Sequence, residues 1–499
     1  MSEKLQVKNP VICHGLFAPH LQSRAKRCLT AALLFASTCI ILILKYKQCW
    51  NHASQPSKLR DFQTCSITNL LSTGLPFLDS AFPLPISEFT TRRQRLAEAL
   101  LADGISAFII EPGYTFQYYA NISQRDWEVW EPEERPFLMV IQPDVRRNGD
   151  VKARTRFLAP SFEVERARLL DMPFGKEEIR EEGLEFVSWE EHWNPYSTLL
   201  EAWKWYGEHS KDLTRRERKP KVMVDEEMRD FIQRGLSENG FEVMGLGGRV
   251  ERVKQTKSEA EIEILRAVNT GTVDAVRAMR RCMYPGLTEN EVMEVLDNTL
   301  RAAGMEPFFD IVLFDENASN PHGGTNGSKV LEAETFVLID VGAHLYGYSS
   351  DICRTFFPPF FPKPTTEAEF RALGPLIQQK LSVWDIVREA QTQSMHALHQ
   401  GKSAASVDIA ARRVITDAGY GNDFSHRVGH GIGIKAHESP YLNKGNSNVT
   451  LEADMTFTSE PGIYLVDRFG VRHEDVLLVK ESGEPENLTG KRAVGPWDP

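Results

Sequence analysis

Cysteine is scarce in most of this chain. Only two of the seven cysteines among its 499 residues, Cys282 and Cys353, lie beyond residue 65. A framework of several disulfides is therefore excluded for the main body, because it would require many cysteines within that body. A bridge between Cys49 and Cys65 would require an oxidising compartment. No cysteines have the spacing of zinc ligands, so a cysteine-based zinc site is not expected.

An excess of positive charge is also missing, since the formal net charge is −11 at pH 7. A protein that binds nucleic acid needs a basic surface against the phosphates, so the sequence predicts no nucleic-acid partner. The chain is longer than one hydrophobic core usually supports, which predicts two domains.

Long apolar runs are missing except for one near the N-terminus. Residues 29–44 are uncharged and mostly apolar, and basic residues flank both ends. As a helix this run would span about 24 Å, which is workable for a membrane if the flanking lysines extend to the interface. The pattern predicts a basic leader over 1–27, a single membrane anchor over 28–46 and a linker over 47–87. The basic residues at both ends leave the side of the membrane open.

Strand and helix signals alternate after this segment. Residues 92–110 predict an amphipathic helix, a glycine stop at Gly104 and a buried strand. Further strand patterns occur at 136–143 and 221–225, with helical stretches near them. This alternation predicts an α/β domain over 88–248, without an obvious catalytic cluster.

The second predicted domain covers residues 249–499 and begins with helices. Ser258 and Glu261 form a capping-box pattern at the start of a long helix, and a second helix follows Pro285-Gly286. Strand patterns then dominate, and they carry almost every candidate for chemistry.

Two acidic residues lie within the apolar stretch TFVLIDVGAHLYGYSSDICRTFF, residues 335–357, which predicts a hairpin. A turn centred between Leu345 and Tyr346 would place Asp340 directly opposite Asp351. Facing carboxylates destabilise a sheet, and a divalent cation between them would remove the repulsion. In the alternative interpretation, one of the two aspartates caps a turn and points to solvent.

Further candidate ligands lie near the C-terminus. The stretch HRVGHGIGIKAHE, residues 426–438, contains three histidines among three glycines that disfavour a helix, and a glycine-rich loop with incidental histidines is the alternative. Glu460 and Glu474 border apolar strand patterns. Four carboxylates and an imidazole would form a set able to hold two dications with balanced charge.

The motifs IDVGA, SSDICRTFF, GHGIG, SEPGIY and RHED make the region from about 250 to 490 resemble the pita-bread metallopeptidases. That group contains methionine aminopeptidase, aminopeptidase P and prolidase. The N-terminal α/β domain is similar to the one in aminopeptidase P, prolidase and creatinase, which methionine aminopeptidases lack. The resemblance implies an α/β N-terminal domain followed by an α+β pita-bread catalytic domain.

The resemblance also implies a dinuclear metal centre. Asp351 and Glu474 would bridge two metal ions, with Asp340 on one ion and His430 and Glu460 on the other. Ligand hardness and the resemblance together favour Mn²⁺, with Co²⁺, Zn²⁺ and Fe²⁺ as alternatives. The glycines around His430 would let the backbone approach the metals closely.

Other roles follow from the same resemblance. His322, His426 and His437 would line the substrate pocket, Arg472 would act on the substrate side, and Glu460 would be the general base. Four other histidines lack such a context and are expected at the surface or in turns: His344, His396, His399 and His473.

The implied activity is metal-dependent hydrolysis of an N-terminal Xaa-Pro bond in a proline-containing peptide, by an aminopeptidase or a dipeptidase. Two alternatives on the same fold are a metal-free creatinase-like hydrolase and a non-catalytic binding protein. The family often dimerises, so a homodimer is a further expectation.

Overall fold

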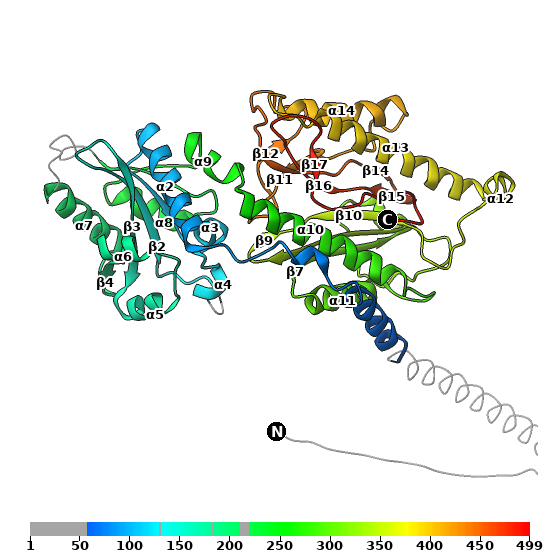
Figure 1. The fold of residues 1–499 in the computed structure, drawn as a ribbon, viewed down its shortest axis with the longest axis horizontal. Helices are drawn as coiled ribbons and strands as arrows, with labels where there is room; N and C mark the ends of the chain where they lie inside the picture. The colour runs from blue at the N-terminus through cyan, green and yellow to red at the C-terminus, as the bar shows by residue number, and fades with distance from the viewer. Residues whose placement is uncertain (1–56, 129–130, 182–183, 210–218) are drawn as a thin grey trace, which may run out of the picture. The chain divides into compact units, whose positions relative to one another are not determined.

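The structure, a computed structural model, describes residues 57–128, 131–181, 184–209 and 219–499 (Figure 1). The predicted leader and membrane anchor, residues 1–46, lie outside this part. Within the described ranges, no helix is both long and apolar enough to cross a membrane. This finding contradicts the predicted anchor, membrane partner and single-pass localisation, which we do not retain.

A six-stranded mixed sheet organises the first half of the described chain, in the order β4-β3-β2-β1-β5-β6. All four residues of β1 are buried, as its apolar sequence predicts for a strand covered on both faces. The strands are β1 (Ala107–Ile110), β2 (Leu138–Val145), β3 (Val151–Pro160), β4 (Glu185–Trp189), β5 (Lys221–Val224) and β6 (Glu242–Met244). The helices are α2 (Ile86–Ala102), α3 (Tyr114–Ala120), α4 (Gln124–Trp127), α5 (Val164–Leu169), α6 (Lys176–Glu181), α7 (Pro195–His209), α8 (Asp230–Glu238) and α9 (Gly248–Gln255).

Helices and antiparallel sheets form the second half. The predicted capping box of Ser258 and Glu261 is present at the start of α10. The helices are α10 (Glu259–Arg280), α11 (Glu289–Ala302), α12 (Glu367–Ala372), α13 (Pro375–Ala397) and α14 (Ala404–Asp417). The strands are β7 (Glu306–Phe314), β8 (Val337–Leu345), β9 (Tyr348–Ser349), β10 (Ile352–Phe356), β11 (Gly429–Gly431), β12 (Glu438–Leu442), β13 (Thr456–Ser459), β14 (Gly462–Leu465), β15 (Phe469–Arg472), β16 (Asp475–Leu478) and β17 (Glu486–Asn487).

Two of these sheets meet where the candidate ligands lie. One has the order β10-β8-β7, with β9 also paired to β8, and the other has the order β12-β11-β13-β16-β17. An isolated bridge between Cys353 and Glu474 joins them. Residues far apart in the chain are thereby brought to one place.

The register of the β8–β9 hairpin differs from the prediction. Leu345 pairs with Tyr348, and Asp340 pairs with Cys353 rather than facing Asp351. The reason is the turn itself, because Tyr346 and Gly347 both have positive φ, at 49° and 86°. Two such residues form a two-residue type I′ loop, which moves the centre of the turn one residue along the chain.

The predicted linker, residues 47–87, contains regular structure in its described part. Residues 57–71 form a helix, and a short 3-10 helix follows at η1 (Pro76–Leu78). Cys65 forms a disulfide with Cys282, which lies two residues beyond the end of α10. A bridge from Cys65 to Cys49 is expected from the sequence only in an oxidising compartment, and Cys49 lies outside the described residues. A pairing across 217 positions leaves no local spacing signal from which it could be predicted.

Candidate metal centre

Five side chains from separate strands converge where the two sheets meet. Asp340 lies on β8, Asp351 between β9 and β10, His430 on β11, Glu460 just after β13, and Glu474 between β15 and β16. Their donor atoms form overlapping groups in which all atoms lie within 4.8 Å of one another: Asp340, Asp351 and Glu474; His430, Glu460 and Glu474; and Asp351, His430 and His437. The structure thus brings together all five residues that the sequence proposed as ligands.

His430 is placed by its glycine neighbours. A Cβ on Gly429 would lie 2.1 Å from the carbonyl oxygen of Thr458, and one on Gly431 would lie 2.7 Å from that of Glu438. Only glycine permits such close approach of backbones, so β11 can pack between β12 and β13. The glycines therefore serve strand packing around His430.

The carboxylates of this cluster have unusual surroundings for a metal-free site. The Oδ1 atom of Asp340 is buried and has no hydrogen-bond partner in the described part of the chain. Burial, and next the neighbouring carboxylates, raise the pKa of Asp351 and of Glu474 well above the ordinary range. A divalent cation would satisfy the orphaned oxygen and offset the crowded charge, so the donor set fits the implied metal ions.

Glu460 differs from these carboxylates. Burial alone would raise its pKa, but the hydrogen bond and charge of His430, helped by His426 and Arg472, lower it to about 2. The nearest atoms of His430 and Glu460 are 3.3 Å apart. Glu460 therefore remains ionised across the neutral range.

The crowded carboxylates predict that stability depends on pH in the metal-free protein. Because burial and neighbouring carboxylates raise the pKa values of Asp351 and Glu474 in the folded state, their protonation stabilises the fold fully below about pH 4, the ordinary carboxyl pKa. This stabilisation is lost as pH rises through the folded-state pKa values. With a chelator present, we expect the melting temperature of the protein to fall between about pH 5 and about pH 8. The increase in melting temperature on adding metal should therefore be larger at about pH 8 than at about pH 5. A metal-induced rise that is equal at both pH values would contradict this prediction.

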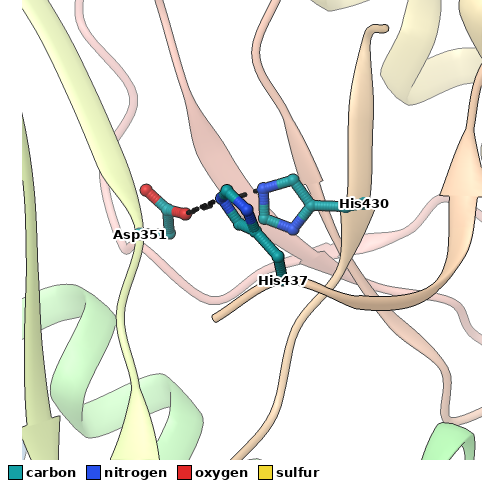
Figure 2. A group of neighbouring side chains, drawn as sticks. All are labelled: Asp351, His430 and His437. Atoms are coloured by element: carbon teal, nitrogen blue, oxygen red, sulfur yellow. Dashed lines mark ion pairs between the residues drawn. The ribbon is translucent and has the colours of Figure 1, made fainter. Parts of the chain in front are cut away.

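The predicted histidines occupy two kinds of position. The side chain of His437 is 53% exposed, its Nε2 lies 3.6 Å from Asp351, and its ring lies 4.0 Å from that of His430. Figure 2 shows both rings directed at Asp351. His322 is exposed on the loop after η4 (Asp315–Ser319) and lies close enough to His426 to lower its pKa, although burial is the larger cause.

His426 is held by two hydrogen bonds and belongs to a buried chain of contacts. Its Nδ1 lies 2.7 Å from the Arg427 carbonyl, and its Nε2 lies 2.7 Å from the Tyr464 hydroxyl. Arg472 donates to this hydroxyl at 2.8 Å and also to the carboxylate of Asp340. Sequence reasoning missed Tyr464, because in the apolar run GIYL it has the pattern of an ordinary core aromatic.

Two other histidines differ from the expectation of surface or turn positions. His473 is fully buried against the Trp384 ring, and both of its ring nitrogens lack a partner among the described residues. Burial lowers its pKa to about 3, so it is neutral. His344 is half-buried in β8 and its ring stacks on that of Phe308. His344 lies on β8, and His473 lies in the short connection between β15 and β16, where it packs against Trp384 of α13. Local sequence does not indicate these contacts, because they join segments that are distant in the chain.

A buried glutamate holds the loop that carries His322. The Glu289 carboxylate accepts the Phe314 N–H at 2.7 Å and the Asn317 side-chain amide at 2.9 Å. Glu289 is fully buried at the start of α11. The loop also contacts Arg472, which donates to the Pro321 carbonyl at 3.1 Å.

Replacing Glu289 by alanine should leave both donors unpaired and destabilise the fold by about 2–3 kcal/mol. We expect kcat to fall while the metal content stays unchanged, because the loop moves but the ligands do not. Glu291→Ala is the matched control, since this residue of the same helical turn only completes the cap with Thr288. Equal kcat values for the two variants, measured on metal-loaded protein, would show that Glu289 does not position the loop.

Comparisons with known proteins define the class. The profile of metallopeptidase family M24 matches residues 263–481. An uncharacterized peptidase of Schizosaccharomyces pombe is 37% identical over 471 residues, which cover 93% of this chain and 95% of that protein.

Solved structures agree with this match. A dipeptidase from Pyrococcus horikoshii superposes with a TM-score of 0.64 at 27% identity, covering 80% of this chain and 98% of its own. An Xaa-Pro dipeptidase from Bacillus anthracis superposes with a TM-score of 0.61 at 26% identity, covering 81% and 98%. The fold is therefore that of the pita-bread metallopeptidases with an N-terminal α/β domain, as predicted. The chain belongs to metallopeptidase family M24.

Proposed function

We propose that this metallopeptidase hydrolyses the bond between an N-terminal residue and a following proline, using two divalent cations. The observation that carries the proposal is the convergence of four carboxylates and His430 around the unpartnered, buried oxygen of Asp340. The Bacillus anthracis neighbour is an Xaa-Pro dipeptidase, which supports the proline preference.

The five ligands would divide between two cations, with Asp351 and Glu474 shared, Asp340 on one ion and His430 and Glu460 on the other. When bound, such cations polarise the scissile carbonyl and bring the pKa of a water molecule towards neutrality. Four carboxylates balance the charge of two dications, and an oxygen-rich set with one imidazole favours Mn²⁺, with Co²⁺, Zn²⁺ or Fe²⁺ as alternatives.

The other side chains move protons and stabilise charge. Glu460, ionised at neutral pH, accepts the proton of the attacking water and passes it to the leaving proline nitrogen. The hydroxide adds to the carbonyl carbon, the C–N bond breaks, and the nitrogen leaves as a neutral amine. His437, which lies 3.6 Å from Asp351, and His322, whose charge acts on His426, are both exposed. They would donate to the developing negative charge on the carbonyl oxygen. His426, with both nitrogens engaged, would hold Tyr464 and Arg472 in place.

The test compares Xaa-Pro peptides with Xaa-Ala peptides of equal length on purified protein, together with elemental analysis. We expect two bound metal ions per chain, preferential cleavage of the Xaa-Pro bond, loss of activity with a chelator, and its best restoration by Mn²⁺. Undiminished cleavage after the metals are removed would contradict the metal chemistry. Equal cleavage of both peptide series would contradict the proline preference, and absence of both metal and cleavage would favour a binding protein.

A further inference from the structure

A cavity of about 770 Å³ is lined by residues other than the candidate metal ligands. Its wall combines the ends of β1 and β5, from Glu111 to Tyr114 and from Asp225 to Arg229, with Phe308 of β7 and the β8–β9 hairpin. None of the described residues that line it is a candidate metal ligand. The metal ions would therefore not occupy this cavity.

The β8–β9 hairpin connects the metal centre to this cavity. Asp340 and His344 lie four residues apart on β8, so their side chains point to the same face of the sheet. Four residues of strand span about 13 Å. His344 and the turn residues Tyr346 and Gly347 then form part of the cavity wall.

The segment from Lys435 to His437 also connects the candidate metal centre to the cavity. Lys435 lies two residues before His437, whose ring is 3.6 Å from Asp351. The Lys435 ammonium pairs with Glu226 at 2.9 Å and with Glu227 at 2.7 Å, and Glu227 lines the cavity. Both segments therefore place the cavity a few residue lengths from the scissile position.

The charged groups of the wall already have partners. Glu111 pairs with Arg229 at 2.7 Å, and Arg125 pairs with Glu306 at 2.6 Å. Because these charges neutralise one another, little unpaired charge is left for a ligand.

The rings of the wall are what a ligand would contact. Tyr114, Phe308, His344 and Tyr346 contribute aromatic surface, and the Phe308 and His344 rings stack with centroids 4.1 Å apart. Tyr346 is 46% exposed at the hairpin tip. Such a wall matches an apolar, ring-bearing side chain.

We propose that this cavity binds an aromatic residue about four positions on the C-terminal side of the scissile bond, so that the enzyme acts on oligopeptides as well as dipeptides. The inference rests on the proposed function. An exopeptidase that removes one residue leaves only the C-terminal side of its substrate to extend through the site. An extended peptide covers the distance from Asp340 to His344 in about four residues.

The experiment measures kcat/KM of the metal-loaded full chain for Ala-Pro and for longer Ala-Pro peptides with phenylalanine or glycine at the fourth position after the scissile bond. For the wild type, phenylalanine should raise kcat/KM about tenfold over glycine, mainly through KM. In Phe308→Ala and Tyr114→Ala, the ratio for the phenylalanine and glycine peptides should fall to about one. Phe370→Ala, which removes a 43% exposed ring on α12, is the matched control and should keep the wild-type ratio.

The outcomes separate the two proposals. Cleavage of Ala-Pro alone, or a phenylalanine preference that survives in both cavity variants, would overturn the cavity proposal and leave the proposed function intact. Absence of cleavage of every Xaa-Pro bond by protein that holds its metals would overturn both. Loss of the preference in the cavity variants and not in Phe370→Ala supports the assignment.

Discussion

Replacing Asp351 by asparagine is expected to lower kcat about 10³-fold or more and to remove at least one of the two metal ions. Asp351 contributes to two of the three donor groups, one with Asp340 and Glu474 and one with His430 and His437. A neutral amide offers one oxygen and no charge, so the charge balance that we propose between four carboxylates and two dications would be lost. Elemental analysis and kcat on an Xaa-Pro peptide measure both effects.

The same variant should not lose stability when metal is absent. Burial and the neighbouring carboxylates raise the pKa of Asp351, which means that its charge is unfavourable in the metal-free fold. With a chelator present, Asp351→Asn should therefore melt at the same temperature as the wild type or higher. This behaviour separates a catalytic defect from unfolding.

Asp310→Asn is the matched control for this substitution. Asp310 lies on β7 next to the residue that pairs with Asp340, on the opposite face, and burial raises its pKa to about 6. We expect this variant to keep both metal ions and most of its activity. An Asp351→Asn protein with two metal ions and wild-type kcat would disprove the metal-ligand role.

Replacing Arg472 by methionine is expected to cost about 3–5 kcal/mol of unfolding free energy and to reduce activity. The guanidinium is fully buried, donates to Asp340, and donates to Tyr464 at 2.8 Å. Its removal would leave the buried Asp340 carboxylate without the guanidinium that pairs with it. It would also remove the hydrogen bond that holds the Tyr464 hydroxyl next to His426. Denaturant unfolding and the pH profile of kcat measure the two consequences.

Arg93→Met provides the control for the loss of a buried arginine. Arg93 is fully buried near the first sheet, pairs with Glu178 at 3.0 Å, and donates to two backbone carbonyls. Both variants should lose comparable stability, but only Arg472→Met should change the pH profile of kcat. If Arg472→Met lost less than about 1 kcal/mol of unfolding free energy and kept the pH profile of kcat, Arg472 would contribute no more than an exposed salt bridge does.

The order and type of the main elements could be predicted from local patterns. The apolar run that became β1, the glycine stop at Gly104 and the capping box of Ser258 are signals within a few neighbouring residues. The register of the β8–β9 hairpin was not predicted correctly, because it depends on which two residues take positive φ. Tyrosine rarely adopts positive φ, so the sequence gives no indication that Tyr346 is one of the two turn residues.

The sequence by itself determined the chemistry that is available, since the identity of the acids and of His430 decides which cations and reactions are accessible. Only the tertiary structure decided which side chains share one place. The bridge between Cys353 and Glu474, the Cys65–Cys282 disulfide and the contact of Tyr464 with His426 join distant segments. Such contacts depend on how whole sheets pack against each other, and patterns among neighbouring residues do not predict that packing.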